Sequence, residues 1–314
     1  MEYSQAITNL INGIQTKTNH PIKINVTEQA LPYLRNEQGM YHRDKFGNDI
    51  IEINNINAHE YLLTHELLHL WLQVTNYPQL HFNLITGLNT KSDMLLTNIT
   101  TLLYESVTHV LIHQKQVTMH IWNDKIAQMY INGLERVINV SNNNFQVLIW
   151  QILNMFDALV ILGATNDVFA QWQHSDAYRY ALELWQVLQG KPIDSPFTFH
   201  RLVVRIFATF EHILSNELHL PALALREFAT LTPVLSNRQL RLRVEQVFSL
   251  IPSAFVNANT KQQAYLGLGI SDHQNAFVLP VDLHQVKISE YLDDLKQQPL
   301  IQVLNKYHFA YLQR

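Results

Sequence analysis

Apolar residues along most of the chain recur at the three- and four-residue spacing of helices. From Asn57 onward this spacing predicts a series of helices. Their approximate bounds are 58–75, 92–115, 123–139, 144–163, 166–189, 197–217, 222–233, 237–250 and 286–305. Strand signals almost vanish over this part of the chain, apart from a possible short strand at AFVLPV (276–281).

The first 57 residues have a mixed pattern. A short helix is expected at about 3–15, and IKINV (22–26) is typical of a strand. GMYHRD and DIIEINN flank the turn segment KFGN, which predicts a β-hairpin with Gly47 near its bend. We expect a mainly α protein with a small N-terminal β-region, an α+β fold.

A polar run, Ser141 to Asn144, marks the best candidate for a domain boundary. We therefore expect one region at 1–140, which contains the hairpin and the helix at 58–75, and a helical C-terminal region at 141–314. No internal repeat or long linker is evident.

Composition narrows the classes of function. The chain of 314 residues is 47% hydrophobic, which is typical of a globular protein, and its net charge of -4 provides no global basic field for nucleic acid. The absence of cysteine excludes disulfide scaffolds, cysteine zinc ligands, iron–sulfur clusters and cysteine nucleophiles.

The chain is expected to be cytoplasmic and not to associate with a membrane. Its start, MEYSQAITNLINGIQ, lacks the basic residues and continuous apolar run of a secretory signal. The most apolar later stretch, 147–164, is interrupted by Gln151, Asn154 and Asp157, so a buried helix with a polar stripe is favoured over a membrane span.

One motif carries recognisable chemistry: His65-Glu66-Leu67-Leu68-His69, an HExxH sequence. Four residues of helix turn through about 400°, so both imidazoles project from one face and can share a metal ion. Glu66 lies about 100° round the helix, where it can act as a general base toward water activated by that metal.

On this motif the chain resembles the zincin metallopeptidases, whose HExxH helix packs beside a sheet. The resemblance covers about 48–75. The metzincin branch requires a glycine and a third histidine shortly after the motif, and LWLQVTNYP contains neither. The gluzincin branch takes its third ligand from a glutamate on a later helix, and Glu105 is the glutamate of the next predicted helix. The resemblance thus implies Zn²⁺ bound by His65, His69 and Glu105.

Other residues have less certain roles. Thermolysin-like gluzincins carry an aspartate one turn after the ligating glutamate, where this chain has His109. His109 could help to orient a ligand, stabilise the oxyanion, replace Glu105 as a ligand, or simply pack. Asp157 could serve as a substitute orienting group. Candidates for an oxyanion-stabilising group are Tyr104, Tyr130, His174, Tyr178, Tyr180 and His200.

The resemblance implies hydrolysis of peptide bonds, with a peptide or protein as substrate. Asn48 to Asn54 would form the edge strand that pairs with the substrate backbone. The alternative is a non-catalytic helical binding or scaffold protein that retains a zincin-like core. A di-iron bundle requires a second ExxH motif, which the chain lacks, and a serine hydrolase requires a G-x-S-x-G elbow, which is also missing.

Overall fold

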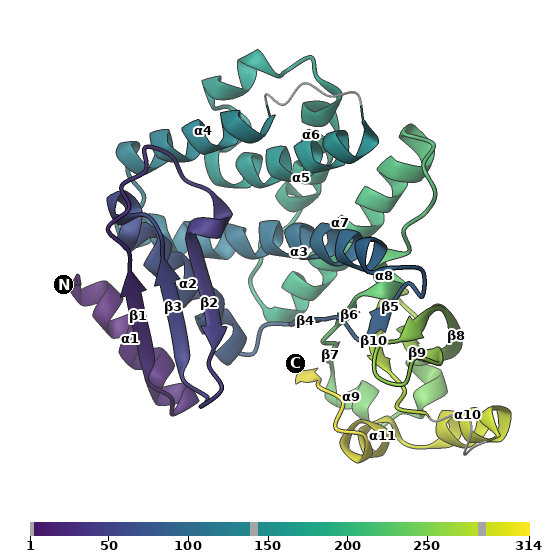
Figure 1. The fold of residues 1–314 in the computed structure, drawn as a ribbon. Helices are drawn as coiled ribbons and strands as arrows, with labels where there is room; N and C mark the ends of the chain where they lie inside the picture. The colour runs from purple at the N-terminus through teal and green to yellow at the C-terminus, as the bar shows by residue number, and fades with distance from the viewer. Residues whose placement is uncertain (1–2, 139–143, 282–286) are drawn as a thin grey trace. The chain divides into compact units, whose positions relative to one another are not determined.

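The computed structural model describes residues 3–138, 144–281 and 287–314 (Figure 1). The chain forms two compact units, each built from two segments. Unit 1 comprises Met1–Asn76 and Ser106–Gln186, and unit 2 comprises Tyr77–Glu105 and Val187–Arg314. This division differs from the expected boundary near residue 140, most of whose polar run lies outside the described residues.

Unit 1 contains a three-stranded sheet in the order β1-β3-β2. Strand β1 (Ile22–Val26) pairs in parallel with β3 (Asp49–Ile53), and β2 (Gly39–Arg43) pairs with β3 in antiparallel fashion. The predicted strand at 22–26 and the predicted hairpin are therefore confirmed. The expectation that residues 48–54 form an edge strand is wrong, because β1 occupies the other side of β3. Strand β2 is an edge strand.

Two helices pack against one face of this sheet (Figure 1). Helix α1 (Gln5–Thr18) is capped by Ser4, and α2 (His59–Val74) follows β3 through the single turn η2 (Ile56–Ala58). Alternate residues of β3 are buried because they meet these helices: Ile51 and Ile53 join the core formed with residues of α1 and α2, including Ile7, Ile14, Leu63 and Leu67.

The other elements that the structure describes in unit 1 are helices. Helix α3 (Thr90–Thr118) begins in unit 2 and contributes its second half to unit 1. It is followed by α4 (Asp124–Ile138), α5 (Phe145–Leu162), the short turn η3 (Asp167–Gln171) and α6 (Asp176–Gln189). By length and composition α5 could cross a membrane, but eight of its residues are buried, as expected for a core helix.

Unit 2 contains a second sheet, of which the sequence predicted only the short strand at 276–281, where β10 forms. Its order is β10-β9-β8-β5. Its strands are β5 (Leu84–Ile85), β8 (Phe248–Asn257), β9 (Gln263–Gly269) and β10 (Asn275–Val278). Two short pairs join β4 (Leu80–His81) to β6 (Thr230–Leu231) and β7 (Val234–Leu235) to β11 (Leu312–Gln313). The C-terminal part is therefore not wholly helical.

The helices of unit 2 match the prediction only in part. Helix α7 (Pro196–His212) continues into a wider turn at Ile213–Glu217, and α10 (Ile288–Gln297) and α11 (Leu300–Lys306) share the place of the predicted last helix. The prediction of long helices at 222–233 and 237–250 is wrong. The short helices α8 (Leu225–Phe228) and α9 (Asn237–Leu240) and the single turn Val244–Gln246 form there instead, together with strand residues.

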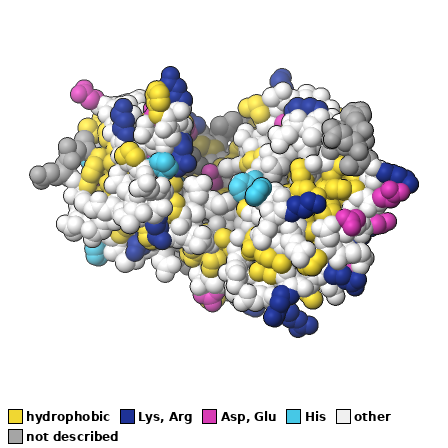
Figure 2. All heavy atoms as spheres, turned by 90° about the horizontal axis from the view of Figure 1, so that it is seen from below, with side chains coloured by type: hydrophobic (Ala, Val, Ile, Leu, Met, Phe, Trp, Pro, Cys, Tyr) yellow, Lys and Arg dark blue, Asp and Glu magenta, His cyan; other side chains and the backbone are white. Residues whose placement is uncertain are grey.

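The face drawn in Figure 2 shows Lys and Arg side chains scattered among uncharged ones rather than gathered into one patch. This distribution agrees with the small net charge of the chain.

Candidate metal centre

The HExxH segment lies in the middle of α2, and its two histidines project from one face of the helix. Nε2 of His65 lies 3.1 Å from Nε2 of His69, and their ring centroids are 4.7 Å apart. Two imidazole nitrogens bound to the same tetrahedral zinc are about 3.3 Å apart, from the Zn–N bond length and the tetrahedral angle. The pair is therefore spaced as two ligands of one ion would be.

Helix α3 supplies the third donor, His109. One ring nitrogen from each of His65, His69 and His109 can be chosen so that all three lie within 4.8 Å of one another. The ring centroid of His109 is 4.8 Å from that of His65 and 5.4 Å from that of His69. All three residues belong to unit 1, and His109 is buried.

Asp157 of α5 fixes the orientation of His109. Its Oδ1 lies 2.6 Å from Nδ1 of His109, and its Oδ2 accepts a hydrogen bond of 2.8 Å from the hydroxyl of Tyr130. A hydrogen bond from the side chain of Ser106 also reaches this carboxylate. Because Nδ1 of His109 is used by Asp157, its Nε2 is the nitrogen left for a metal, and a carboxylate behind a ligating histidine is a frequent arrangement in metal sites.

The protonation states suit metal binding. Burial raises the pKa of the Asp157 carboxyl, but the neighbouring His109 and the hydrogen bonds outweigh burial and hold it below its usual value. Burial lowers the pKa of His65 and of His69 well below the ordinary value, and the neighbouring histidines lower both further. Both imidazoles are therefore neutral near pH 7, the form that binds metal.

Glu66 is half-buried, and its side chain extends from α2 toward strand β2. Its Oε1 would be only 2.8 Å from a Cβ added to Gly39, which is the first residue of β2. The missing side chain of Gly39 thus leaves the space that the Glu66 carboxylate fills. Strand β2 therefore limits where the Glu66 carboxylate can lie.

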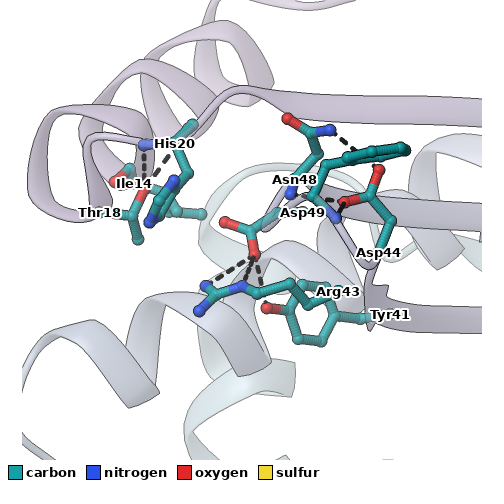
Figure 3. Close-up of polar contacts among 9 residues, drawn as sticks. Ile14, Thr18, His20, Tyr41, Arg43, Asp44, Asn48 and Asp49 are labelled. Carbon is teal, nitrogen blue, oxygen red and sulfur yellow. Dashed lines mark hydrogen bonds and ion pairs between the residues drawn. The ribbon is translucent and has the colours of Figure 1, made fainter.

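Polar contacts hold the hairpin that carries Gly39 (Figure 3). The buried Asp49 of β3 accepts hydrogen bonds from the hydroxyl of Tyr41 (2.7 Å) and from Nε of Arg43 (2.9 Å), both on β2. At the turn, the Asp44 carboxylate accepts hydrogen bonds from the backbone of Phe46 and from the backbone and side chain of Asn48. These contacts fix β2 against β3 at the end away from Gly39.

Glu105, the first choice for a third ligand, is not in the donor group that the described residues form. It lies one turn before His109 on α3, in the segment assigned to unit 2. His109, which the sequence analysis gave as a replacement, is in the group. A ligand role for Glu105 stays a prediction without support from this geometry.

The other predicted site residues are divided among several places. Tyr104 donates a hydrogen bond of 2.8 Å to the carbonyl of Pro78, and its ring packs edge-on against Phe199. Tyr130 bonds to Asp157. His174 is exposed, Tyr180 is buried in a helix, and His200 lies in unit 2. Tyr178 packs against Phe169.

Gly39 had no signal in the sequence that would have associated it with the site, and Ser106 was also missed. His113, one turn after His109, is a further histidine in this region. Burial lowers its pKa, and its ring packs edge-on against Trp122 at 4.8 Å. A three- or four-residue spacing along α3 could have associated Ser106 and His113 with His109.

No protein-family model matches the sequence, and neither a curated protein nor a solved structure matches it significantly. What the site can do must therefore be argued from its own geometry.

Proposed function

We propose that the chain is a zinc-dependent metallopeptidase whose metal is held by His65, His69 and His109. The observation that carries this proposal is the convergence of three ring nitrogens from α2 and α3, with Asp157 behind His109 and with Glu66 next to His65 in the sequence of α2. Three imidazoles form a set that suits zinc and leaves a fourth position open.

Each residue then has a defined task. His65, His69 and His109 bind the ion, and Asp157 keeps Nε2 of His109 directed at it. Zinc, when bound, supplies Lewis acidity that polarises the substrate carbonyl and makes water more acidic. Glu66 takes the proton from the attacking water and passes it to the leaving amine.

Strand β2 supports the choice of a peptide as substrate. It is an edge strand, and its outer side pairs with no strand of the described residues, so its backbone groups can pair with an extended peptide. Gly39, at its first residue, meets the Glu66 side chain. A peptide on this edge would therefore run close to the proposed general base. In this proposal β2 takes the role that the sequence analysis gave to residues 48–54.

The test is hydrolysis of a mixed peptide library by the zinc-loaded protein, read by mass spectrometry. Glu66→Gln should reduce turnover by about 10²-fold or more, because the general base is lost, and should leave zinc content unchanged. Glu60→Gln, on the first turn of the same helix, is the matched control and should retain activity.

Absence of cleavage by the zinc-loaded wild type would contradict the proposal and favour the non-catalytic binding protein. Full activity of Glu66→Gln would contradict the role of Glu66.

A further inference from the structure

Unit 2 has a pocket of its own, built without any residue of the histidine group. It has a volume of about 400 Å³, within the range of small-molecule sites. It is lined by the start of α7, by the segment around β7, and by the ends of β8, β9 and β10. We name it the α7 pocket; its charged lining residues are Arg201, Asp272 and Arg314.

Two arginines give the α7 pocket a positive side. The guanidinium groups of Arg201 and Arg314 lie 5.6 Å and 3.5 Å from the centre of the Phe197 ring. Arg201 is exposed and forms no ion pair with the described residues. A guanidinium held on an aromatic ring but without a carboxylate partner is suited to bind a carboxylate ligand in two-point contact.

A carboxylate gives the same pocket a negative side. Asp272 packs over Gly269, and a Cβ at Gly269 would overlap its Oδ1. Nδ1 of His200 lies 3.9 Å from Oδ2 of Asp272. Arg226 donates a hydrogen bond of 3.4 Å from Nη1 to the backbone carbonyl of Asp272, but its ion pair is with Glu211. Burial lowers the pKa of His200 to about 4, so this imidazole is neutral near pH 7 and leaves the charge of Asp272 uncompensated.

A buried acceptor lies in the wall beside Asp272. Gln274 is 2% exposed, and its Nε2 donates to the carbonyl of Ala229 at 2.6 Å. Its Oε1 is buried and has no hydrogen-bond partner in the described part of the chain. Buried acceptors are usually paired, so a ligand that donates hydrogen bonds near Asp272 would complete this wall.

We propose that the α7 pocket binds a small zwitterion, a free amino acid or a dipeptide, with its carboxylate at Arg201 and Arg314 and its ammonium group at Asp272. Both signs of charge are present, both are uncompensated within the described residues, and the volume suits a ligand of this size. The inference does not depend on the proposed peptidase activity, because the pocket shares no residue with the histidine group.

The test compares three probes by calorimetry on the full chain: L-leucine, 4-methylpentanoate, which lacks the amine, and 3-methylbutylamine, which lacks the carboxylate. Leucine should bind about tenfold or more tightly than either single-charge probe, because each charge-assisted contact contributes at least that factor. Arg201→Gln should weaken leucine and the acid but not the amine. Asp272→Asn should weaken leucine and the amine but not the acid.

Arg205→Gln is the matched control, one turn further along α7 and outside the pocket, and should bind leucine as the wild type does. The double variant His65→Ala/His69→Ala should also retain leucine binding. The proposal is overturned by no leucine binding up to about 10 mM, by equal binding of the three probes, by equal losses in Arg201→Gln and Arg205→Gln, or by loss of binding in the double histidine variant.

Discussion

At the scale of a single residue, substitution of Asp157 tests whether His109 is a metal ligand. Asp157→Asn removes the negative charge that holds Nδ1–H of His109, so the ring loses its fixed orientation. We expect zinc affinity to fall by about 10- to 100-fold, as for other groups that orient a ligand. Competition with a fluorescent zinc chelator measures this change.

Tyr130→Phe is the matched comparison, because it removes only the hydrogen bond to Oδ2 of Asp157. It should weaken zinc binding less than Asp157→Asn does. Unchanged zinc affinity in Asp157→Asn would show that this carboxylate does not support a metal ligand.

Gly39 tests the position of the proposed general base. Gly39→Ala places a methyl group 2.8 Å from Oε1 of Glu66, which is too close for an ordinary contact. This carboxylate is the flexible end of a side chain, so it should move aside with little loss of stability. We expect kcat for peptide cleavage to fall by about tenfold, since a displaced base transfers the proton less well. Zinc content and thermal midpoint should stay as in the wild type.

Met40→Ala, at the next residue of β2, is the control; its side chain is exposed. If Gly39→Ala had the same kcat as the wild type, the claim that Gly39 leaves the space needed by the Glu66 carboxylate would be contradicted.

At this scale the sequence predicted the local part of the site and left the distant part open. His65 and His69 belong to one helical turn, so their spacing alone places them together. The third donor depends on how α3 packs against α2, and helical spacing could not decide between Glu105 and His109. Asp157 was suggested by residue type, and its contact with His109 is a tertiary one. The meeting of Gly39 with Glu66 requires the packing of β2 on α2.

Helix α4 provides a test at the scale of an element. Its Gly133 lies directly against the backbone of Leu34, and a Cβ there would overlap the carbonyl oxygen of that residue. The amide of Leu34 also donates a hydrogen bond of 2.8 Å to the carbonyl of Met129. Gly133→Ala should therefore lower the free energy of unfolding by about 1–3 kcal/mol, as overpacking does. Urea denaturation followed by circular dichroism measures it.

Gly190→Ala is the control, because its Cβ would be 3.5 Å from the nearest atom, an ordinary contact. A Gly133→Ala protein as stable as the wild type would contradict the close packing of α4 on this segment.

Helices and strands whose apolar residues follow a single spacing were predictable from the sequence. Segments whose apolar spacing fits both a helix and a strand were not. The hairpin has a turn signal, and α2 to α5 have sustained helical spacing. In contrast, residues 237–250 have apolar side chains at spacings that fit a helix or a strand. Strand β8 begins at Phe248 and includes Pro252, where its register with β9 shifts. Pairing with β9 and β5 decides its structure, and such long-range contacts leave no local pattern.

At the scale of the whole molecule, the chain is a helix-rich protein with two units, each with its own sheet. The proposed metal site lies within unit 1 and brings together α2, α3 and α5. The α7 pocket lies within unit 2. The two proposals can therefore be tested independently, each by substitutions within its own unit.

The central claim is that His65, His69 and His109 hold a metal ion. The most direct measurement is zinc content by plasma mass spectrometry after zinc loading and desalting, on untagged wild type, His109→Ala and Glu105→Ala. The account predicts about one zinc per chain in the wild type and in Glu105→Ala, and loss of zinc in His109→Ala. Wild type without zinc, or zinc retained in His109→Ala and lost in Glu105→Ala, would contradict it.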